Sequence, residues 1–208
     1  MRYKAVFFDL DGTLMDTSDG VFAGGVYAMR EQGQVISDSA NWDVFIGPPL
    51  GDCFRLTFGI TDDDLIKRLC QSYHDFYEKE GQFRAKFYPG ILDVVGELKK
   101  RGYILGIASM KNQDMVQSMC HHFGVDCFFT EQVGIDLVGT MTKADLLSAA
   151  FKHLHLSAKD CVLIGDTELD VQGAMGAGCD CIRVNWGFGF KSGTPGTISH
   201  PSEILALV

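Results

Sequence analysis

The stretch Val6-Phe7-Phe8-Asp9-Leu10-Asp11-Gly12-Thr13 is the part of the chain that we expect to decide the fold. The apolar run from Ala5 to Phe8 is rich in residues that favour strands, and it predicts a strand buried on both faces. Two carboxylates, on Asp9 and Asp11, follow this strand, and Gly12 permits a turn that a Cβ atom would obstruct. These polar residues could simply cap the strand in an Asx-turn. A hydrophobic strand that ends in acid-x-acid-Gly-Thr is nevertheless unusual and indicates a functional site.

Composition limits the class of protein and of partner. The chain has 208 residues, 46% of them hydrophobic and 22% charged, which is typical of a globular protein with one sizeable core and a small second unit. The net charge of −9 argues against nucleic acid or an anionic membrane surface as a partner. An anionic substrate would therefore require locally placed positive charge or a metal ion.

Cysteine usage and the apolar runs bear on location. The chain has seven cysteines, an odd number, without the paired spacing of a zinc site. We expect reduced thiols, as in a cytosol. No apolar run approaches the ~20 residues that span a bilayer, and the N-terminus lacks the pattern of a signal peptide. These features predict a cytoplasmic protein, and they leave open whether it is a monomer or a homodimer.

The segment 15–83 differs in pattern from the rest of the chain. Apolar residues recur at helical spacing between Phe22 and Met29, and three acids at Asp62–Asp64 suit the start of a second long helix. Between these helices, Trp42–Leu50 contains two prolines and is expected to be a loop. No convincing strand pattern occurs here, so we expect a small all-α unit inserted after the first strand.

From Tyr88 onward, predicted strands and helices alternate. We expect strands at 103–108, 127–130, 161–164 and 181–184, and helices around 91–98, 112–123, 143–154 and 170–178, followed by a loop at 187–201. Alternation of this kind implies βαβ crossovers and a parallel sheet. The predicted fold is therefore α/β, a Rossmann-like parallel sheet core with helices on both faces, formed by 1–14 and 84–208.

Four polar clusters follow predicted strands or open predicted helices. They are Asp9, Asp11 and Thr13; Ser109, Met110, Lys111 and Asn112; Lys143; and Gly165 to Asp170. Each has a simpler explanation on its own, as a helix cap or a solvated charge. In an open parallel sheet, however, ligands bind outside the carboxyl ends of the strands, where these clusters would meet. Four independent coincidences would be needed to explain them all as caps.

Phosphoryl transfer is the chemistry that suits these residue types. A phosphate dianion repels a carboxylate nucleophile, so a divalent cation, a cationic side chain and hydroxyl donors are needed to hold it. Carboxylate and carbonyl oxygens are suitable ligands for Mg²⁺. One carboxylate can attack the phosphorus atom, and another can protonate the leaving oxygen.

These motifs resemble the signature of the haloacid dehalogenase superfamily, mostly phosphatases that work through an aspartyl phosphate, and the resemblance covers nearly the whole chain. It implies that Asp9 is the nucleophile, and that Asp11 is the general acid and base, with its backbone carbonyl on the metal. The remaining roles that it implies are phosphate binding by Thr13, Ser109 and Lys143, Mg²⁺ binding by Asp9, Asp11 and Asp166, and support from Asp170 and Lys111.

Further motifs resemble the phosphoglycolate-phosphatase-like branch of that superfamily. They are Tyr88-Pro89-Gly90, Gly173-Ala174-x-x-Ala177-Gly178 and Trp186-Gly187-x-Gly189. In that branch a helical cap domain sits between the first and second polar clusters, which agrees with the insert expected at 15–83, and we expect this insert to close over the site. The resemblance makes Asp16, Thr17, Gly47 and Pro48 candidates for contact with the substrate.

Departures from the motifs of this branch leave the identity of the substrate undecided. Met110, Asn112 and the Ala144 that follows Lys143 are unlike many phosphoglycolate phosphatases. The segments Ile46-Gly47-Pro48-Pro49-Leu50 and Lys143-Ala144-Asp145-Leu146 look more like relatives that act on nucleotides or other small phosphates. We expect a Mg²⁺-dependent phosphatase of small phosphorylated metabolites. The alternatives are a phosphosugar mutase (beta-phosphoglucomutase-like), a nucleotidase, or a catalytically idle module that binds a phosphorylated metabolite.

Overall fold

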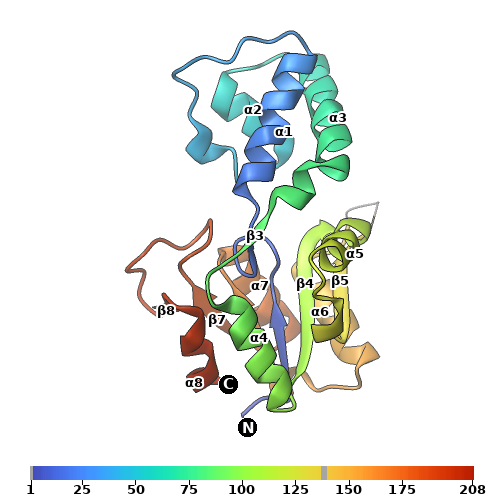
Figure 1. Ribbon diagram of the computed structural model, residues 1–208, viewed down its shortest axis with the longest axis vertical. Coiled ribbons are helices and arrows are strands. Elements are labelled where there is room, and N and C mark those ends of the chain that lie inside the picture. Colours follow the sequence, from blue (N-terminus) through green and yellow to red (C-terminus); the bar gives the residue numbers. More distant parts are fainter. Residues whose placement is uncertain (1, 137–139) are drawn as a thin grey trace. The chain divides into compact units, whose positions relative to one another are not determined.

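A computed structural model describes residues 2–136 and 140–208 (Figure 1). The chain divides into two compact units. Met1–Asp16 and Phe87–Val208 form an α/β unit, and Thr17–Lys86 form a helical unit. The expected boundaries of 15 and 83 lie within three residues of these junctions.

The α/β unit is built on a six-stranded sheet whose order is β5-β4-β1-β6-β7-β8. The strands are β1 (Ala5–Phe8), β4 (Ile104–Asn112), β5 (Glu131–Ile135), β6 (Cys161–Gly165), β7 (Asp180–Val184) and β8 (Thr197–Ile198). Every neighbouring pair is parallel. The predicted α/β class with a parallel sheet is confirmed.

The central strand β1 is where the strand order reverses. After β1 the chain adds β4 and β5 on one side, and it then crosses to add β6, β7 and β8 on the other. At such a switch point the two connecting segments leave in opposite directions, which opens a crevice at the carboxyl end of the strand. The Asp9-Leu10-Asp11-Gly12 turn lies at this end of β1.

Helices cover both faces of the sheet. They are α4 (Ile91–Lys100), α5 (Gln113–His122), α6 (Lys143–His153), α7 (Glu168–Ala177) and α8 (Ile204–Leu207). On one face Phe7 packs with Leu147 and Phe151 of α6, the two phenyl centroids being 5.3 Å apart. Val6 and Phe8 point to the other face because side chains alternate along a strand, and both are fully buried. Figure 1 shows α4 in front of the sheet and α7 behind it.

The helical unit contains α1 (Ser18–Glu31), α2 (Leu50–Phe58) and α3 (Asp63–Lys79). Its core is aromatic, with Phe45, Phe54, Tyr73 and Tyr77 buried. The predicted start of the long helix is capped by Asp62, whose carboxylate accepts from the backbone N–H groups of Asp64 and Leu65 at 2.9 and 3.2 Å.

Three local expectations differ from the structure. Residues Asp126–Phe128 form a 3-10 turn, and the strand begins only at Glu131, so the strand expected at 127–130 is wrong. Phe129, one of the apolar residues of this segment, is buried, and its ring centroid lies 6.3 Å from that of Phe8. Short strands also occur where none was expected: β2 (Met15–Asp16) pairs with β3 (Lys86–Phe87), and β8 lies in the expected loop. Two-residue strands are too short to show an alternating pattern.

Across the described residues, no helix combines the length and apolar character needed to cross a membrane.

Candidate active site

Among the described residues of the α/β unit, six have buried polar or charged side chains. They are Asp9, Thr13, Ser109, Lys143, Asp166 and Asp170, each at most 8% exposed. All six are candidates from the sequence. Asp9 and Thr13 follow β1, Asp166 follows β6, and Lys143 and Asp170 lie in the first turn of α6 or α7. Ser109 lies within β4, because this strand continues to Asn112, beyond the end expected at 108. Burial of unpaired charge costs several kcal/mol per ion, so their partners decide how this arrangement is tolerated.

Strand register brings the ends of three strands level with one another. Phe8 of β1 is opposite both Ile107 of β4 and Ile164 of β6. Asp9 is therefore level with the residues that follow those two, and Ser109 and Asp166 lie one position beyond. The backbone N–H of Asp9 continues the ladder and donates to the carbonyl of Ile164 at 2.9 Å.

Lys143 is held between two of the carboxylates. Its Nζ atom lies 2.6 Å from Oδ1 of Asp9 and 2.6 Å from Oδ1 of Asp170. The other oxygen of Asp170 accepts from the Oγ1 and N atoms of Thr167, at 2.7 and 3.0 Å, in the capping box of α7. Both Asp170 oxygens are thereby engaged, so this residue anchors Lys143 and the start of α7.

Asp166 is surrounded by donors. Oδ1 accepts from Oγ1 of Thr13 at 3.1 Å, and Oδ2 accepts from the backbone N–H groups of Phe188 and Gly189 at 2.7 and 3.2 Å. Gly12 makes this packing possible, because a Cβ atom there would lie 2.4 Å from Oδ2 of Asp166, and its φ of 82° also disfavours other residues. The contacts from 188 and 189 were not foreseen, since that segment was expected only to be a loop. The Trp186-Gly187-x-Gly189 pattern was the available signal.

Asp11 pairs with Lys111 at the edge of the site. Nζ of Lys111 lies 3.1 Å from Oδ2 of Asp11, and their side chains are 10% and 28% exposed. The other oxygen, Oδ1, is buried and has no hydrogen-bond partner among the described residues. One carboxylate oxygen is thus held by Lys111, while the other is a buried acceptor with unused hydrogen-bonding capacity, which is uncommon in a folded protein.

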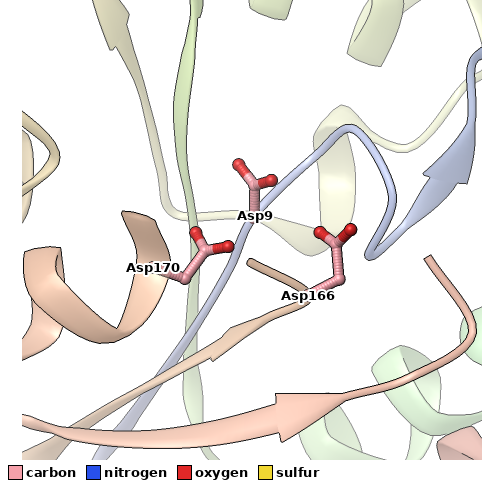
Figure 2. A group of neighbouring side chains, drawn as sticks. All are labelled: Asp9, Asp166 and Asp170. Atoms are coloured by element: carbon pink, nitrogen blue, oxygen red, sulfur yellow. The ribbon is translucent and has the colours of Figure 1, made fainter. Parts of the chain in front are cut away.

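The charges of the site do not balance. Ligand oxygens of Asp9, Asp166 and Asp170 lie within 4.8 Å of one another, and Figure 2 shows the three carboxylates side by side beyond the strand ends. Burial raises the pKa of Asp9 to about 8, with Lys143 opposing the shift and the two other carboxylates adding to it. Burial also raises the pKa of Asp166. For Lys143 burial acts to lower the pKa, but Asp9 and Asp170 outweigh it and raise the pKa.

This imbalance fits a divalent cation. Three buried carboxylates face one buried ammonium group, and the donors are all oxygens, the set that hard cations such as Mg²⁺ prefer. All three carboxylates already have at least one donor or cationic partner, so the choice of Asp9 and Asp166 as cation ligands, with Asp170 in support, stays the prediction made from the sequence.

The predicted substrate-contact residues are divided between the two units. Asp16 is half-buried in β2 and belongs to the α/β unit. Thr17, Gly47 and Pro48 belong to the helical unit, where Thr17 is buried, Gly47 is exposed and the carbonyl of Pro48 accepts from the thiol of Cys53 at 3.2 Å. Their contact with a substrate stays a prediction.

Comparison with known proteins identifies the family. Residues 6–184 match the model of the haloacid dehalogenase-like hydrolases. A 5′-nucleotidase of Pseudomonas aeruginosa is 33% identical over 190 residues, which cover 91% of this chain and 86% of the relative. A pyrophosphatase of Bacillus cereus is 28% identical over 89% of this chain and 85% of its own length.

A solved structure agrees with the sequence matches. The haloacid dehalogenase-like family hydrolase of Streptococcus pneumoniae superimposes with a TM-score of 0.87 at 30% identity, over 99% of this chain and 98% of that protein. The sequence resemblance to this superfamily is confirmed, and so is the expectation of an enzyme. Enzymes of this family generally use a divalent metal, which agrees with the acidic cluster. The chain belongs to the haloacid dehalogenase-like hydrolase family, and it is an enzyme of the phosphatase type.

Proposed function

We propose that this enzyme is a Mg²⁺-dependent phosphatase that hydrolyses small phosphate monoesters through an aspartyl phosphate on Asp9. The observation that carries the proposal is the gathering of six buried polar side chains at the carboxyl ends of β1, β4 and β6. Burying this much charge is costly for the fold, because apolar residues of similar volume would stabilise it as well or better. We expect such a cost to be tolerated where the charged groups act on a ligand.

The first step is attack by a carboxylate oxygen of Asp9 on the phosphorus atom, with cleavage of the bond to the ester oxygen. Lys143 neutralises charge at the transferring group from its position 2.6 Å from Asp9, and the hydroxyl group of Ser109 donates to a phosphate oxygen. Thr13, whose hydroxyl donates to Asp166, would contact the phosphate only after this hydroxyl turns towards it. Asp11 donates a proton to the departing oxygen through Oδ1, the oxygen without a partner.

The second step is hydrolysis of the aspartyl phosphate. Asp11, ionised after the first step, takes a proton from a water molecule whose oxygen attacks phosphorus. The bond between phosphorus and the Asp9 oxygen breaks, which releases inorganic phosphate and regenerates the carboxylate. Lys111 supports this residue by holding Oδ2 at 3.1 Å throughout.

Mg²⁺ would be held by Asp9, the backbone carbonyl of Asp11 and Asp166, with Asp170 in support. When bound, it supplies charge neutralisation between the nucleophile and the phosphate dianion. The surplus of buried negative charge supports this choice of a small oxygen-binding cation.

Two substrate classes are candidates. The motifs of the phosphoglycolate-phosphatase-like branch favour a small carboxylated or sugar phosphate. The 5′-nucleotidase relative, at 33% identity over 91% of this chain, favours a nucleoside monophosphate. A mutase would pass the phosphoryl group from Asp9 to another hydroxyl instead of water, and an idle module would bind phosphate esters without turnover.

A panel of phosphate esters distinguishes these functions. Purified protein is assayed with phosphoglycolate, nucleoside monophosphates and hexose phosphates, and kcat/KM is compared for each ester. We expect turnover with Mg²⁺, loss of turnover in excess chelator, and inhibition by Ca²⁺, which accepts more ligands and could seize both oxygens of Asp9. Full turnover in chelator would contradict the proposal, and binding without turnover of any ester would support the idle module.

We further propose a cytosolic location and a monomeric or homodimeric enzyme. The seven cysteines are all free in the structure, which suits a reducing compartment. Fractionation of cells and light scattering of the purified protein would test both statements.

A further inference from the structure

The loop Trp186–Gly189, here called the Trp186 loop, follows β7 and contacts Asp166, one of the metal-ligand candidates. The backbone N–H groups of Phe188 and Gly189 donate to Oδ2 of Asp166, as described above. The next residue, Phe190, donates its N–H to the backbone carbonyl of Asp166 at 2.8 Å. Three consecutive N–H groups of this segment are thus directed at one residue.

The two glycines of this loop are required by close approach. A Cβ atom on Gly187 would lie 2.1 Å from the carbonyl oxygen of Gly12 and 2.4 Å from Oδ2 of Asp166. A Cβ atom on Gly189 would lie 2.3 Å from the carbonyl oxygen of Asp166. Real Cβ atoms are not found so close to backbone oxygens, so the loop can contact Asp166 only because these positions lack side chains.

The indole of Trp186 connects the loop to the Asp9–Thr13 turn. Its Nε1–H group donates to the carbonyl oxygen of Thr13 at 3.1 Å, and its ring lies against that of Tyr88 with centroids 6.5 Å apart. Thr13 in turn donates to the other carboxylate oxygen of Asp166. The loop therefore ties together the two segments that supply Asp9 and Asp166.

These contacts restrict how Asp166 can bind a cation. Oδ2 already accepts two N–H groups, which occupy its lone pairs, whereas Oδ1 accepts one hydroxyl and keeps one direction free. Such a carboxylate can offer a cation one oxygen but not both. Mg²⁺ needs single oxygens in octahedral geometry, whereas Ca²⁺ takes six to eight ligands and commonly binds carboxylates through both oxygens.

We propose that the Trp186 loop is a positioning element that fixes Asp166 as a one-oxygen ligand, and that it thereby makes the site selective for Mg²⁺ over Ca²⁺. This inference rests on the proposed function only in that Asp166 is taken as a metal ligand. Trp186 acts through Thr13 and the loop backbone and does not itself touch the cation.

Direct binding measurements on the metal-free protein test the proposal. Dissociation constants for Mg²⁺ and Ca²⁺ are measured by calorimetry for the wild-type protein, Trp186→Phe and Gly187→Ala. Removal of a supporting contact typically weakens metal binding about 10–100-fold, and we expect a loss of about tenfold for Mg²⁺ in Trp186→Phe. Because Asp166 is then freed to bind through both oxygens, Ca²⁺ should lose less, so the ratio of the two constants should shift towards Ca²⁺ in both variants.

Two controls separate positioning from general loss of structure. Trp42→Phe makes the same side-chain change in the helical unit, and Gly96→Ala adds a methyl group where the nearest atom would be 4.0 Å away. Both should keep the wild-type constants for the two cations.

The outcomes are distinguishable. If wild-type protein binds Mg²⁺ and turns over phosphate esters while the loop variants keep the same Ca²⁺/Mg²⁺ ratio, the inference is overturned and the phosphatase function stands. Equal weakening for both cations would likewise make the loop a structural element without selectivity. If the wild-type protein binds neither cation and works in chelator, the metal-dependent function fails and the inference fails with it.

Discussion

The α/β unit buries four charged side chains, those of Asp9, Lys143, Asp166 and Asp170, whereas the helical unit, across its described residues, buries none. The buried polar side chains of the helical unit are the neutral ones of Thr17, Thr57, Ser72 and Gln82. Its core is instead a cluster of rings, in which Phe45, Phe54 and Phe58 lie 5.2 to 6.1 Å apart between centroids. The α/β unit thus buries charged groups in its interior, whereas the described interior of the helical unit is aromatic and neutral.

This difference predicts different responses to substitution. In the α/β unit, the buried carboxylates repel one another, so neutralising one should damage the chemistry while leaving the fold as stable or more stable. In the helical unit, the rings contribute packing alone, so truncating one should reduce stability and leave the chemical step unchanged.

Asp9→Asn should abolish turnover, with a loss of about 10⁴-fold or more, because an amide is a poor nucleophile and a weaker metal ligand. No acid-stable, hydroxylamine-sensitive phosphoprotein should form. Retention of a tenth of the wild-type rate, only ~1.4 kcal/mol in barrier, would point instead to direct attack by water.

The same variant should keep its fold. A carboxyl whose pKa is raised by burial, to about 8 for Asp9, destabilises the folded state as pH rises from its unfolded value towards that pKa. Removing the charge relieves this cost, so in chelator at pH 8 the Tm of Asp9→Asn should equal or exceed that of wild type. The difference should shrink near pH 4, where both side chains are uncharged, and a lower Tm at pH 8 would contradict the argument.

Asp11→Asn should slow formation of the aspartyl phosphate about 10²–10⁴-fold for an alkyl phosphate, because an alkoxide must be protonated as it leaves. The loss should be far smaller for p-nitrophenyl phosphate, since nitrophenolate is a weak base. Single-turnover rates must be compared, because slow hydrolysis of the intermediate would limit steady-state rates for both substrates. A burst of nitrophenol is expected, and equal losses in the first step would show that Asp11 is not the acid.

The sequence predicted the α/β unit better than its details. Strand β1, the parallel sheet and the six buried polar side chains could be predicted from the sequence, because an apolar run and the polar clusters near strand ends are local features. The start of β5 was misplaced because the apolar Phe129 precedes the strand. Its side chain packs against Phe8, so its apolar character reflects packing and not a position in a strand. The loop contacts to Asp166 are made by backbone N–H groups of Phe188 and Gly189, and side-chain identity does not encode where such groups point.

The helical unit should respond to a packing change with a loss of stability alone. Phe54 is fully buried, and Phe54→Leu should lower the free energy of unfolding by about 1–2 kcal/mol because ring contacts are lost and the space is incompletely filled. Urea unfolding measures this change, and hydroxylamine-sensitive phosphoprotein measures the chemistry. Reduced phosphoprotein per folded molecule, without reduced stability, would contradict the division between the units.

Lys111→Met should have the smallest effect on the rate, because Lys111 positions the catalytic carboxylate of Asp11 through a partly buried ion pair and takes no direct part in the chemical step. Losing a pair of this kind is worth about 1 kcal/mol, so the rate of aspartyl phosphate formation should fall about fivefold. If the ammonium group acts by holding Oδ2 of Asp11, the loss should be larger for alkyl phosphates than for p-nitrophenyl phosphate, as in Asp11→Asn.

Lys111→Arg, which keeps a donor and the charge, should recover most of the rate. Combined with Asp11→Asn, the Lys111→Met change should add little, since its effect passes through that carboxylate. An equal loss for both substrates, persisting in the double variant, would instead show that Lys111 binds the phosphate directly.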